Sequence, residues 1–111
     1  MLRMTFPVFA PLVPGDHLFE TDTLVAFHHP APVYPVHILI VPRRRYASLL
    51  DVAQDDVEFM RDLFKAVSTL VRELELQRGS YRLIANGGHA QQVRLLHFHL
   101  VAGDPTPSEA V

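Results

Sequence analysis

Two histidines stand two residues apart near the end of the chain, in the stretch LLHFHLVAGD that runs from Leu95 to Asp104. In a β-strand, residues two apart point to the same face of the sheet, so His97 and His99 would present both imidazoles to one side. Such a pair can ligate a metal, act as a nucleophile with an acid or base, or donate hydrogen bonds to an anion. The competing interpretation is two half-exposed histidines on a solvated sheet face.

A third histidine, His37, follows the proline-rich stretch HPAPVYP (residues 29–35) and lies near the start of the apolar run VHILIV (residues 36–41). The prolines exclude a helix interior and a central strand, so an ordered loop is expected there. If the apolar run lies near the strand of His97, three imidazoles converge. Asn86 opens a loop before the last strand and would add an amide, although it also suits a turn that needs positive φ.

The elements that must position these side chains are predicted from the periodicity of the sequence. Apolar and β-branched runs predict strands at residues 23–28, 36–41, 81–85 and 93–102. Residues 53–74 change to spacings of three and four, which predict one amphipathic helix after a short turn at residues 48–51. Gly79 is expected as the glycine that stops this helix. The predicted buried stripe of the helix consists of Val57, Met60, Phe64, Val67, Val71 and Leu74, widened by Leu63 and Leu70.

The order of the elements predicts an α+β fold, with an antiparallel sheet of about five strands and one long helix packed on one face. A length of 111 residues fits a single domain, residues 1–111, with a proline-rich and flexible tail at residues 104–111. The net charge of −2 offers no basic surface for a nucleic acid polymer. The chain has no cysteine and no apolar run of membrane-spanning length, so a cytoplasmic protein that does not bind membranes is expected.

Several ordered segments together resemble the histidine triad (HIT) family of nucleotide hydrolases and transferases, close to its adenosine-phosphoramidase (HINT-like) branch. LVAFHHPAPVYPVHILIVPRR resembles the nucleotide-pocket strand, proline loop and second strand of that family. The helix and GSYRLIANGG resemble its central helix and third strand, and QQVRLLHFHLVAGD resembles its signature of histidines that alternate with apolar residues. Leu95 stands at the first signature histidine, and His29 replaces an acidic residue that typically holds the ribose hydroxyls.

The resemblance implies roles for the matching residues. His97 matches the nucleophile, His99 the histidine that contacts the phosphate and assists the leaving group, and His37 the histidine that faces the phosphate site. The positions that would bind substrate are Asn86, Gln91, Gln92, His29 and, as a wall of the base pocket, Phe27.

The implied reaction needs no metal or other cofactor. A His97 ring nitrogen attacks the α-phosphorus of a nucleotide derivative, such as a phosphoramidate or a dinucleoside phosphate, and water then releases a nucleoside monophosphate from the nucleotidyl-histidine. A backbone carbonyl at position 95 can fix the tautomer of the nucleophile in place of the missing imidazole. The resemblance also implies a homodimer.

Two other functions stay open from the residues. The substitutions at Leu95 and His29 are compatible with a weakened, regulatory module that binds nucleotides without turnover. His37, His97 and His99 are also compatible with an open three-histidine metal site, although no carboxylate is evident beside them. The run from Arg43 to Arg45 is interpreted as a solvated loop rather than a phosphate contact.

Overall fold

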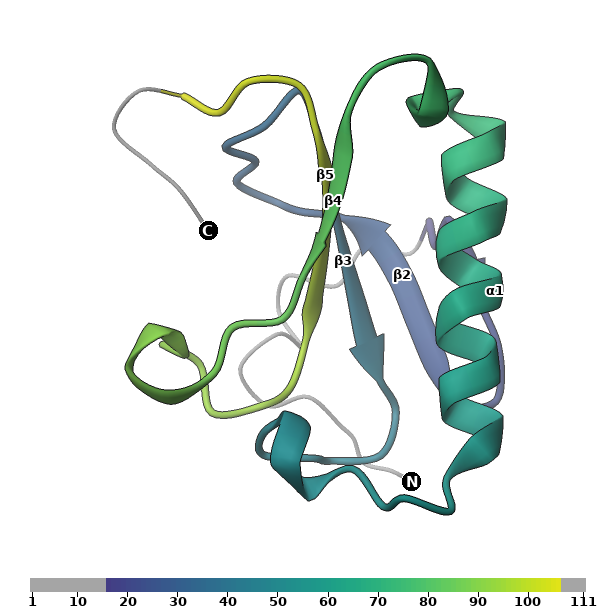
Figure 1. The fold of residues 1–111 in the computed structure, drawn as a ribbon, viewed down its shortest axis with the longest axis vertical. Helices are drawn as coiled ribbons and strands as arrows, with labels where there is room; N and C mark the ends of the chain where they lie inside the picture. Colours follow the sequence, from purple (N-terminus) through teal and green to yellow (C-terminus); the bar gives the residue numbers. More distant parts are fainter. Residues whose placement is uncertain (1–15, 107–111) are drawn as a thin grey trace.

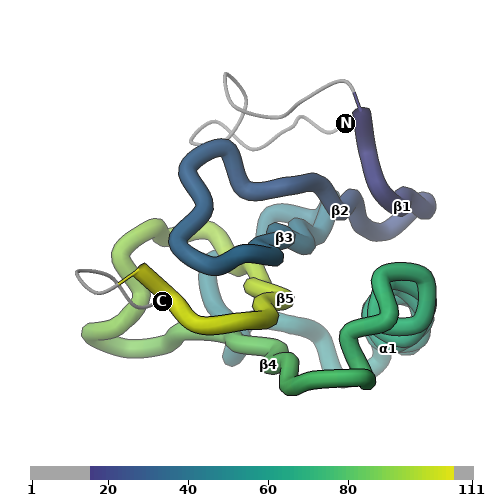
Figure 2. The backbone as a smooth tube through the Cα atoms, turned by 90° about the horizontal axis from the view of Figure 1, so that it is seen from above, coloured from purple at the N-terminus to yellow at the C-terminus, as the bar shows by residue number. Residues whose placement is uncertain are grey.

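The computed structural model describes residues 16–106 of the chain. Five antiparallel strands form one sheet in the order β1-β2-β3-β5-β4, and the helix α1 covers one face of it (Figure 1). Figure 2 shows the same layers from above, with α1 on one side of the sheet. This architecture confirms the predicted fold class. The elements are β1 (Phe19–Glu20), β2 (Leu24–His28), β3 (Val36–Pro42), α1 (Val57–Glu73), β4 (Tyr81–Ile84) and β5 (Phe98–Ala102).

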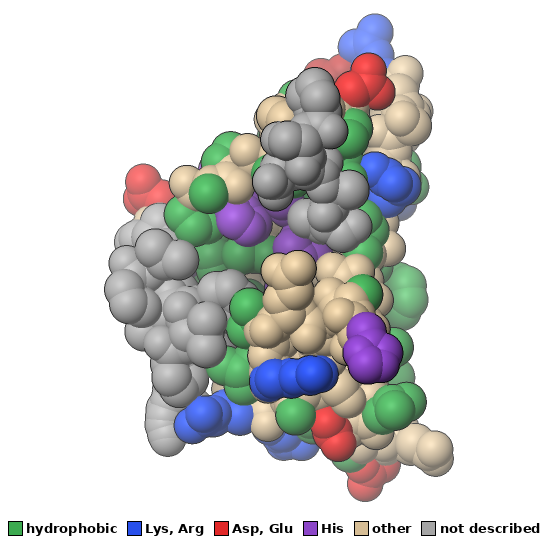
Figure 3. Space-filling view, turned by 90° about the vertical axis from the view of Figure 1, so that its left-hand side faces the viewer, with side chains coloured by type: hydrophobic (Ala, Val, Ile, Leu, Met, Phe, Trp, Pro, Cys, Tyr) green, Lys and Arg blue, Asp and Glu red, His purple; other side chains and the backbone are tan. Residues whose placement is uncertain are grey.

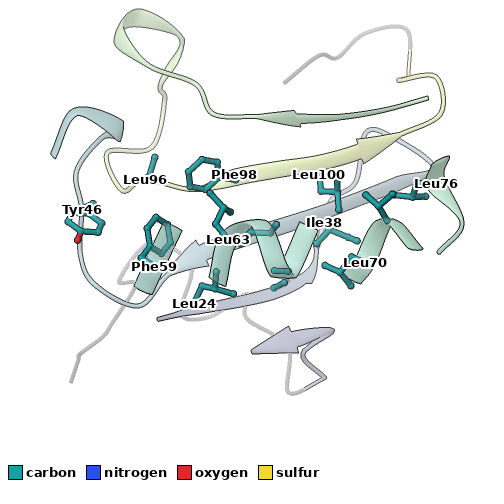
Figure 4. Packing of buried hydrophobic residues seen from close by; sticks show 14 residues of the cluster. Leu24, Ile38, Tyr46, Phe59, Leu63, Leu70, Leu76, Leu96, Phe98 and Leu100 are labelled. Carbon is teal, nitrogen blue, oxygen red and sulfur yellow. The ribbon is translucent and has the colours of Figure 1, made fainter. Parts of the chain in front are cut away.

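The main hydrophobic core lies between α1 and the sheet (Figure 4). Leu24, Ile38 and Leu100 come from three neighbouring strands, and none of them has any exposed surface. Leu96 and Phe98 pack into the same core, as the alternation of the sequence predicts. The histidines that alternate with them are therefore directed to the opposite face of the sheet.

The buried side of α1 matches the predicted stripe only in part: Leu63, Leu70 and Val71 are buried, but the other predicted residues are not. Phe64 is 67% exposed and Val57 51% exposed, and Met60 and Leu74 are exposed as well. The helix has two adjacent apolar stripes, and the sheet covers only one of them, so periodicity alone could not select the buried one. The buried residues of α1 are Phe59, Leu63, Ala66, Leu70 and Val71.

The ends of α1 also differ from the prediction. The carboxylate of Asp56 accepts a hydrogen bond from the Phe59 backbone N–H, which caps the first turn, so the helix begins at residue 57 rather than 53. After Glu73 the chain reverses at Glu75, whose φ of 56° lies in the left-handed region. Gly79, with φ of −130°, is not the residue that stops the helix. The predicted short turn is confirmed as a capped 3₁₀ helix, η2 (Leu49–Asp51).

The last strand is shorter than predicted, because Gln91 and Leu96, which precede it, bond to the loop at residues 46–47 instead of to the sheet. The Leu96 backbone N–H donates to the Tyr46 carbonyl oxygen over 2.8 Å, and the Gln91 amide donates to the Ala47 carbonyl oxygen over 2.6 Å. His97 therefore lies just before β5 rather than inside it. The two-residue edge strand β1 was not predicted.

Most of the predicted tail, residues 107–111, lies outside the described residues. Thr106 is described, and its backbone N–H donates to the Val33 carbonyl oxygen over 2.8 Å. Among residues 16–106, no helix is long and apolar enough to cross a bilayer.

Candidate active site

Four histidines gather on the sheet face opposite α1, and we call them the histidine cluster: His29, His37, His97 and His99. Histidine side chains are visible near the centre of this face in Figure 3. The ring centroids lie 4.4 Å apart for His29 and His37, 5.1 Å for His37 and His99, and 5.0 Å for His97 and His99. The cluster includes all three predicted catalytic histidines and the predicted ribose-binding histidine.

A chain of hydrogen bonds fixes the tautomers of two of these rings. The Val33 backbone N–H donates to His37 Nδ1 over 3.1 Å, so the proton of His37 is on Nε2. His37 Nε2–H donates to His99 Nδ1 over 2.9 Å, so the proton of the His99 ring is on its Nε2. Burial lowers the pKa of His37 to about 4 and that of His99 to about 3, so both rings are neutral near pH 7.

The ring of His97 is oriented by the backbone. Its Nδ1 lies 2.8 Å from the Leu95 carbonyl oxygen, which can only accept, so Nδ1 carries the proton and Nε2 carries the lone pair. Burial lowers the pKa of His97, and the bond to Leu95 opposes that shift. A neutral imidazole with its lone pair on Nε2 is the form that a nucleophile requires.

His29 presents a donor rather than an acceptor. The Ala31 backbone N–H donates to His29 Nδ1 over 2.9 Å, which places the ring proton on Nε2. Burial, followed by the charge of His97, lowers the pKa of His29. A neutral His29 in this tautomer can donate one hydrogen bond to a ligand, whereas a carboxylate at this position would accept two.

The other predicted binding residues fall into two groups. Gln92 is exposed and Asn86 is partly buried just after β4, so both have surface for a ligand. The side chains of Gln91 and Phe27 are buried instead. The amide of Gln91 is bound to the Ala47 carbonyl oxygen, and Phe27 packs in a second small core with Val25, Leu39 and Val41. Those two residues therefore support the fold around the site.

Two further residues, which no sequence motif indicates, support the cluster at His37. The Tyr34 ring meets the His37 ring edge-on at 5.5 Å and 84°. The Arg82 guanidinium donates to the Tyr34 hydroxyl over 2.9 Å. Only the pairing of β4 with β5 brings Arg82 to this face, and no local motif indicates it.

The three-histidine metal hypothesis finds no support in the geometry. Within residues 16–106, no group of three or more His, Cys, Asp or Glu side chains is arranged to hold a metal ion. His37 Nε2 and His99 Nδ1 are bonded to each other, so neither is directed toward a common ion.

The arginine run lies at the far end of β3, where its three residues line a separate pocket that contains none of the histidine cluster. Arg43 donates to the Thr21 carbonyl oxygen, and Arg44 bonds to Tyr46 and Asp56. Arg44 and Arg45 are exposed, as expected for the solvated loop that the sequence indicates.

Comparison with known proteins gives a consistent family assignment. The HIT domain matches residues 11–106 of the chain. A HIT-like protein from Synechococcus elongatus is 36% identical over 93 residues, which cover 82% of this chain and 81% of that protein.

Two solved structures extend this similarity to three dimensions. A HIT family hydrolase from Legionella pneumophila superposes with a TM-score of 0.75 at 29% identity, covering 87% of this chain and 88% of that chain. A histidine triad nucleotide-binding protein from Candida albicans superposes with a TM-score of 0.69 at 28% identity, covering 89% of this chain and 78% of that chain.

Proposed function

The chain belongs to the HIT family, and from this membership we propose that it hydrolyses nucleoside monophosphate derivatives through a nucleotidyl-histidine intermediate on His97. The observation that carries the proposal is the hydrogen bond from His97 Nδ1–H to the Leu95 carbonyl oxygen, which leaves the lone pair on Nε2. The similarity to a hydrolase and to a nucleotide-binding protein supports this choice. Within the family, we place the chain near the adenosine-phosphoramidase branch.

The proposed reaction has two displacements at phosphorus. His97 Nε2 attacks the α-phosphorus, a phosphorus–nitrogen bond forms, and the leaving group departs with the electron pair of the bond that breaks and with one proton from solvent, which the attacking water of the second step returns. His99 Nε2–H donates to a phosphoryl oxygen or to the leaving group, where negative charge develops. Water then attacks the same phosphorus, breaks the bond to His97 and releases the nucleoside monophosphate.

The remaining cluster and loop residues bind the substrate in this proposal. His37 holds His99 in the tautomer that can donate to the phosphate. His29 Nε2–H donates to a ribose hydroxyl, and Asn86 and Gln92 supply amides from the loop after β4. The reaction uses no metal.

The first test is turnover of an adenosine phosphoramidate by wild type and His97→Ala, with a chelator present. We expect kcat of His97→Ala to fall at least about 1,000-fold while AMP still binds, because only the nucleophile is lost. His89→Ala is the matched control, since His89 is exposed and lies outside the cluster. Equal turnover by His97→Ala would exclude the mechanism.

A nucleotide-binding module without turnover is the second candidate. The donor-only His29 and the leucine at position 95 favour it, because both depart from the family pattern. Wild type that binds AMP and leaves the phosphoramidate intact in the same assay would select this function.

We also propose that the chain forms a homodimer through β4 and the exposed stripe of α1. β4 is the last strand of the sheet, so its outer edge can pair with the same strand of a second copy. The residues of this apolar face are the exposed Phe64, Tyr81 and Leu83 and the half-buried Val67, drawn from α1 and β4. A second copy would cover both elements at once.

A further inference from the structure

The proline loop, residues 29–35, is held at three points by segments that are distant in the sequence. The Arg82 guanidinium donates to the Tyr34 hydroxyl over 2.9 Å and lies 5.4 Å from the centre of the Tyr34 ring. The ring of Pro35 packs so closely on Gly103 that a Cβ there would lie 2.7 Å from Pro35 Cγ. The Thr106 backbone N–H donates to the carbonyl oxygen of Val33 over 2.8 Å. The loop and the chain after β5 run side by side in Figure 1.

The loop in turn determines the state of His37. The Val33 backbone N–H donates to His37 Nδ1, and the buried Tyr34 ring packs edge-on against the His37 ring. In a neutral imidazole one ring nitrogen donates and the other accepts, and the two tautomers differ in which nitrogen carries the proton. A single N–H fixed beside one nitrogen can therefore select the tautomer.

If the loop moved away, donor and acceptor could exchange in the hydrogen bond between His37 and His99. Without the Val33 N–H, His37 can carry its proton on Nδ1 and accept at Nε2. His99 would then carry its proton on Nδ1 and would present a lone pair, instead of an N–H, to the phosphate. The donor that the proposed reaction needs at His99 would be lost.

We propose that Tyr34 and Arg82 are positioning residues of this active site. Their hydrogen bond fixes the proline loop so that the Val33 N–H keeps His37, and through it His99, in the Nε2–H tautomer. Neither side chain is assigned a contact with the substrate. The kinetic part of this inference rests on the proposed function, whereas the tautomer part does not.

The test combines ring-nitrogen NMR shifts with kinetics in Tyr34→Phe, Arg82→Met and Arg82→Lys. Tyr34→Phe keeps the ring against His37 and removes only the hydroxyl that Arg82 binds. We expect the ¹⁵N shifts of His37 and His99 to move toward the mixed-tautomer values. We also expect kcat to fall about 10-fold with KM nearly unchanged, as for other groups that orient a reacting side chain.

Arg82→Met is expected to change the ¹⁵N shifts and kcat as Tyr34→Phe does. Arg82→Lys is expected to recover part of the activity, because an ammonium group can still donate to the tyrosine hydroxyl. Arg61→Met is the matched control, since Arg61 is exposed on α1 and lies outside the cluster. The ring nitrogens of the exposed His89 are the internal reference.

Unchanged shifts of His37 and His99 in Tyr34→Phe would overturn the inference, and so would moved shifts with unchanged kcat. If wild type itself does not turn over the phosphoramidate, the proposed function fails, and the shifts alone decide whether Tyr34 and Arg82 set the tautomers.

Discussion

The contact between His97 and Leu95 is made by the backbone of residue 95. The leucine side chain takes no part in the 2.8 Å hydrogen bond that orients the His97 ring. The carbonyl oxygen is present whatever residue stands there, so the loss of the first signature histidine leaves the tautomer of His97 intact. The tautomer of His97 therefore depends on a backbone atom, which a motif of side chains does not describe.

Leu95→Ala tests this point. We expect kcat to stay within about 3-fold of wild type and the ring-nitrogen shifts of His97 to be unchanged, because the carbonyl acceptor remains. Both are measured with the phosphoramidate assay and with ¹⁵N NMR. A large fall in kcat with a shifted His97 tautomer would show that the leucine side chain is required.

In the proposed function, His29 donates one hydrogen bond to a ribose hydroxyl. His29→Asp replaces one donor with a carboxylate that can accept from both ribose hydroxyls, and we expect AMP to bind about 10-fold more tightly. The measurement is calorimetric titration with AMP. His28→Asp is the matched control, since the neighbouring residue is exposed at the end of β2 and points away from the cluster. Weaker or equal binding by His29→Asp would mean that the ribose does not reach this position.

At the scale of elements, α1 has more apolar surface than the sheet can cover. One stripe forms the core with the sheet, while the second stripe continues onto β4 through the exposed side chains of Tyr81 and Leu83. A continuous apolar face over a helix and an edge strand is typical of a subunit interface.

Phe64→Glu tests the interface, because Phe64 is 67% exposed and contributes little to the core of one chain. We expect sedimentation to show a dimer for wild type and a monomer for Phe64→Glu, since a charge would be buried without a partner. Leu50→Glu is the control, as Leu50 is 94% exposed on η2 and lies outside the apolar face. A Phe64→Glu dimer as stable as wild type would exclude this interface.

For the whole molecule, the histidine cluster makes stability depend on pH. Burial lowers the pKa values of all four rings, to about 4 for His37 and about 3 for His99. The unfolded chain takes up protons near pH 6.5, but the folded chain does not until lower pH. The stability that the neutral rings provide is therefore complete above pH 6.5 and is lost as the pH falls toward 3.

Urea unfolding at pH 7, 6 and 5 measures this dependence above the range of most carboxylates. We expect the free energy of unfolding to fall by about 1–2 kcal/mol for each of His37 and His99 between pH 7 and pH 5. His37→Gln should reduce the slope, and His89→Gln should leave it unchanged. A free energy of unfolding of wild type that does not change between pH 7 and pH 5 would mean that the folded chain does not hold these rings neutral.

The sequence alone determined the fold class, the presence of one long helix, and the choice of His37, His97 and His99 as candidate residues. These features follow from local periodicity and from the order of elements, which neighbouring residues encode. The alternation of Leu96 and Phe98 with the histidines, for example, already predicts which side chains face the core and which face the candidate site.

Only the tertiary structure decided which stripe of α1 is buried, where β5 begins, and how the imidazole protons are arranged. The first two depend on contacts between distant segments, the sheet against α1 and the Tyr46 loop against Leu96, and the position of the His99 proton depends on the bond to His37. His37 and His99 are 62 residues apart, and their hydrogen bond exists because antiparallel pairing of β3 with β5 brings them together. Local patterns cannot select among such pairings, because the free energy that selects them comes from packing and hydrogen bonding in the folded chain.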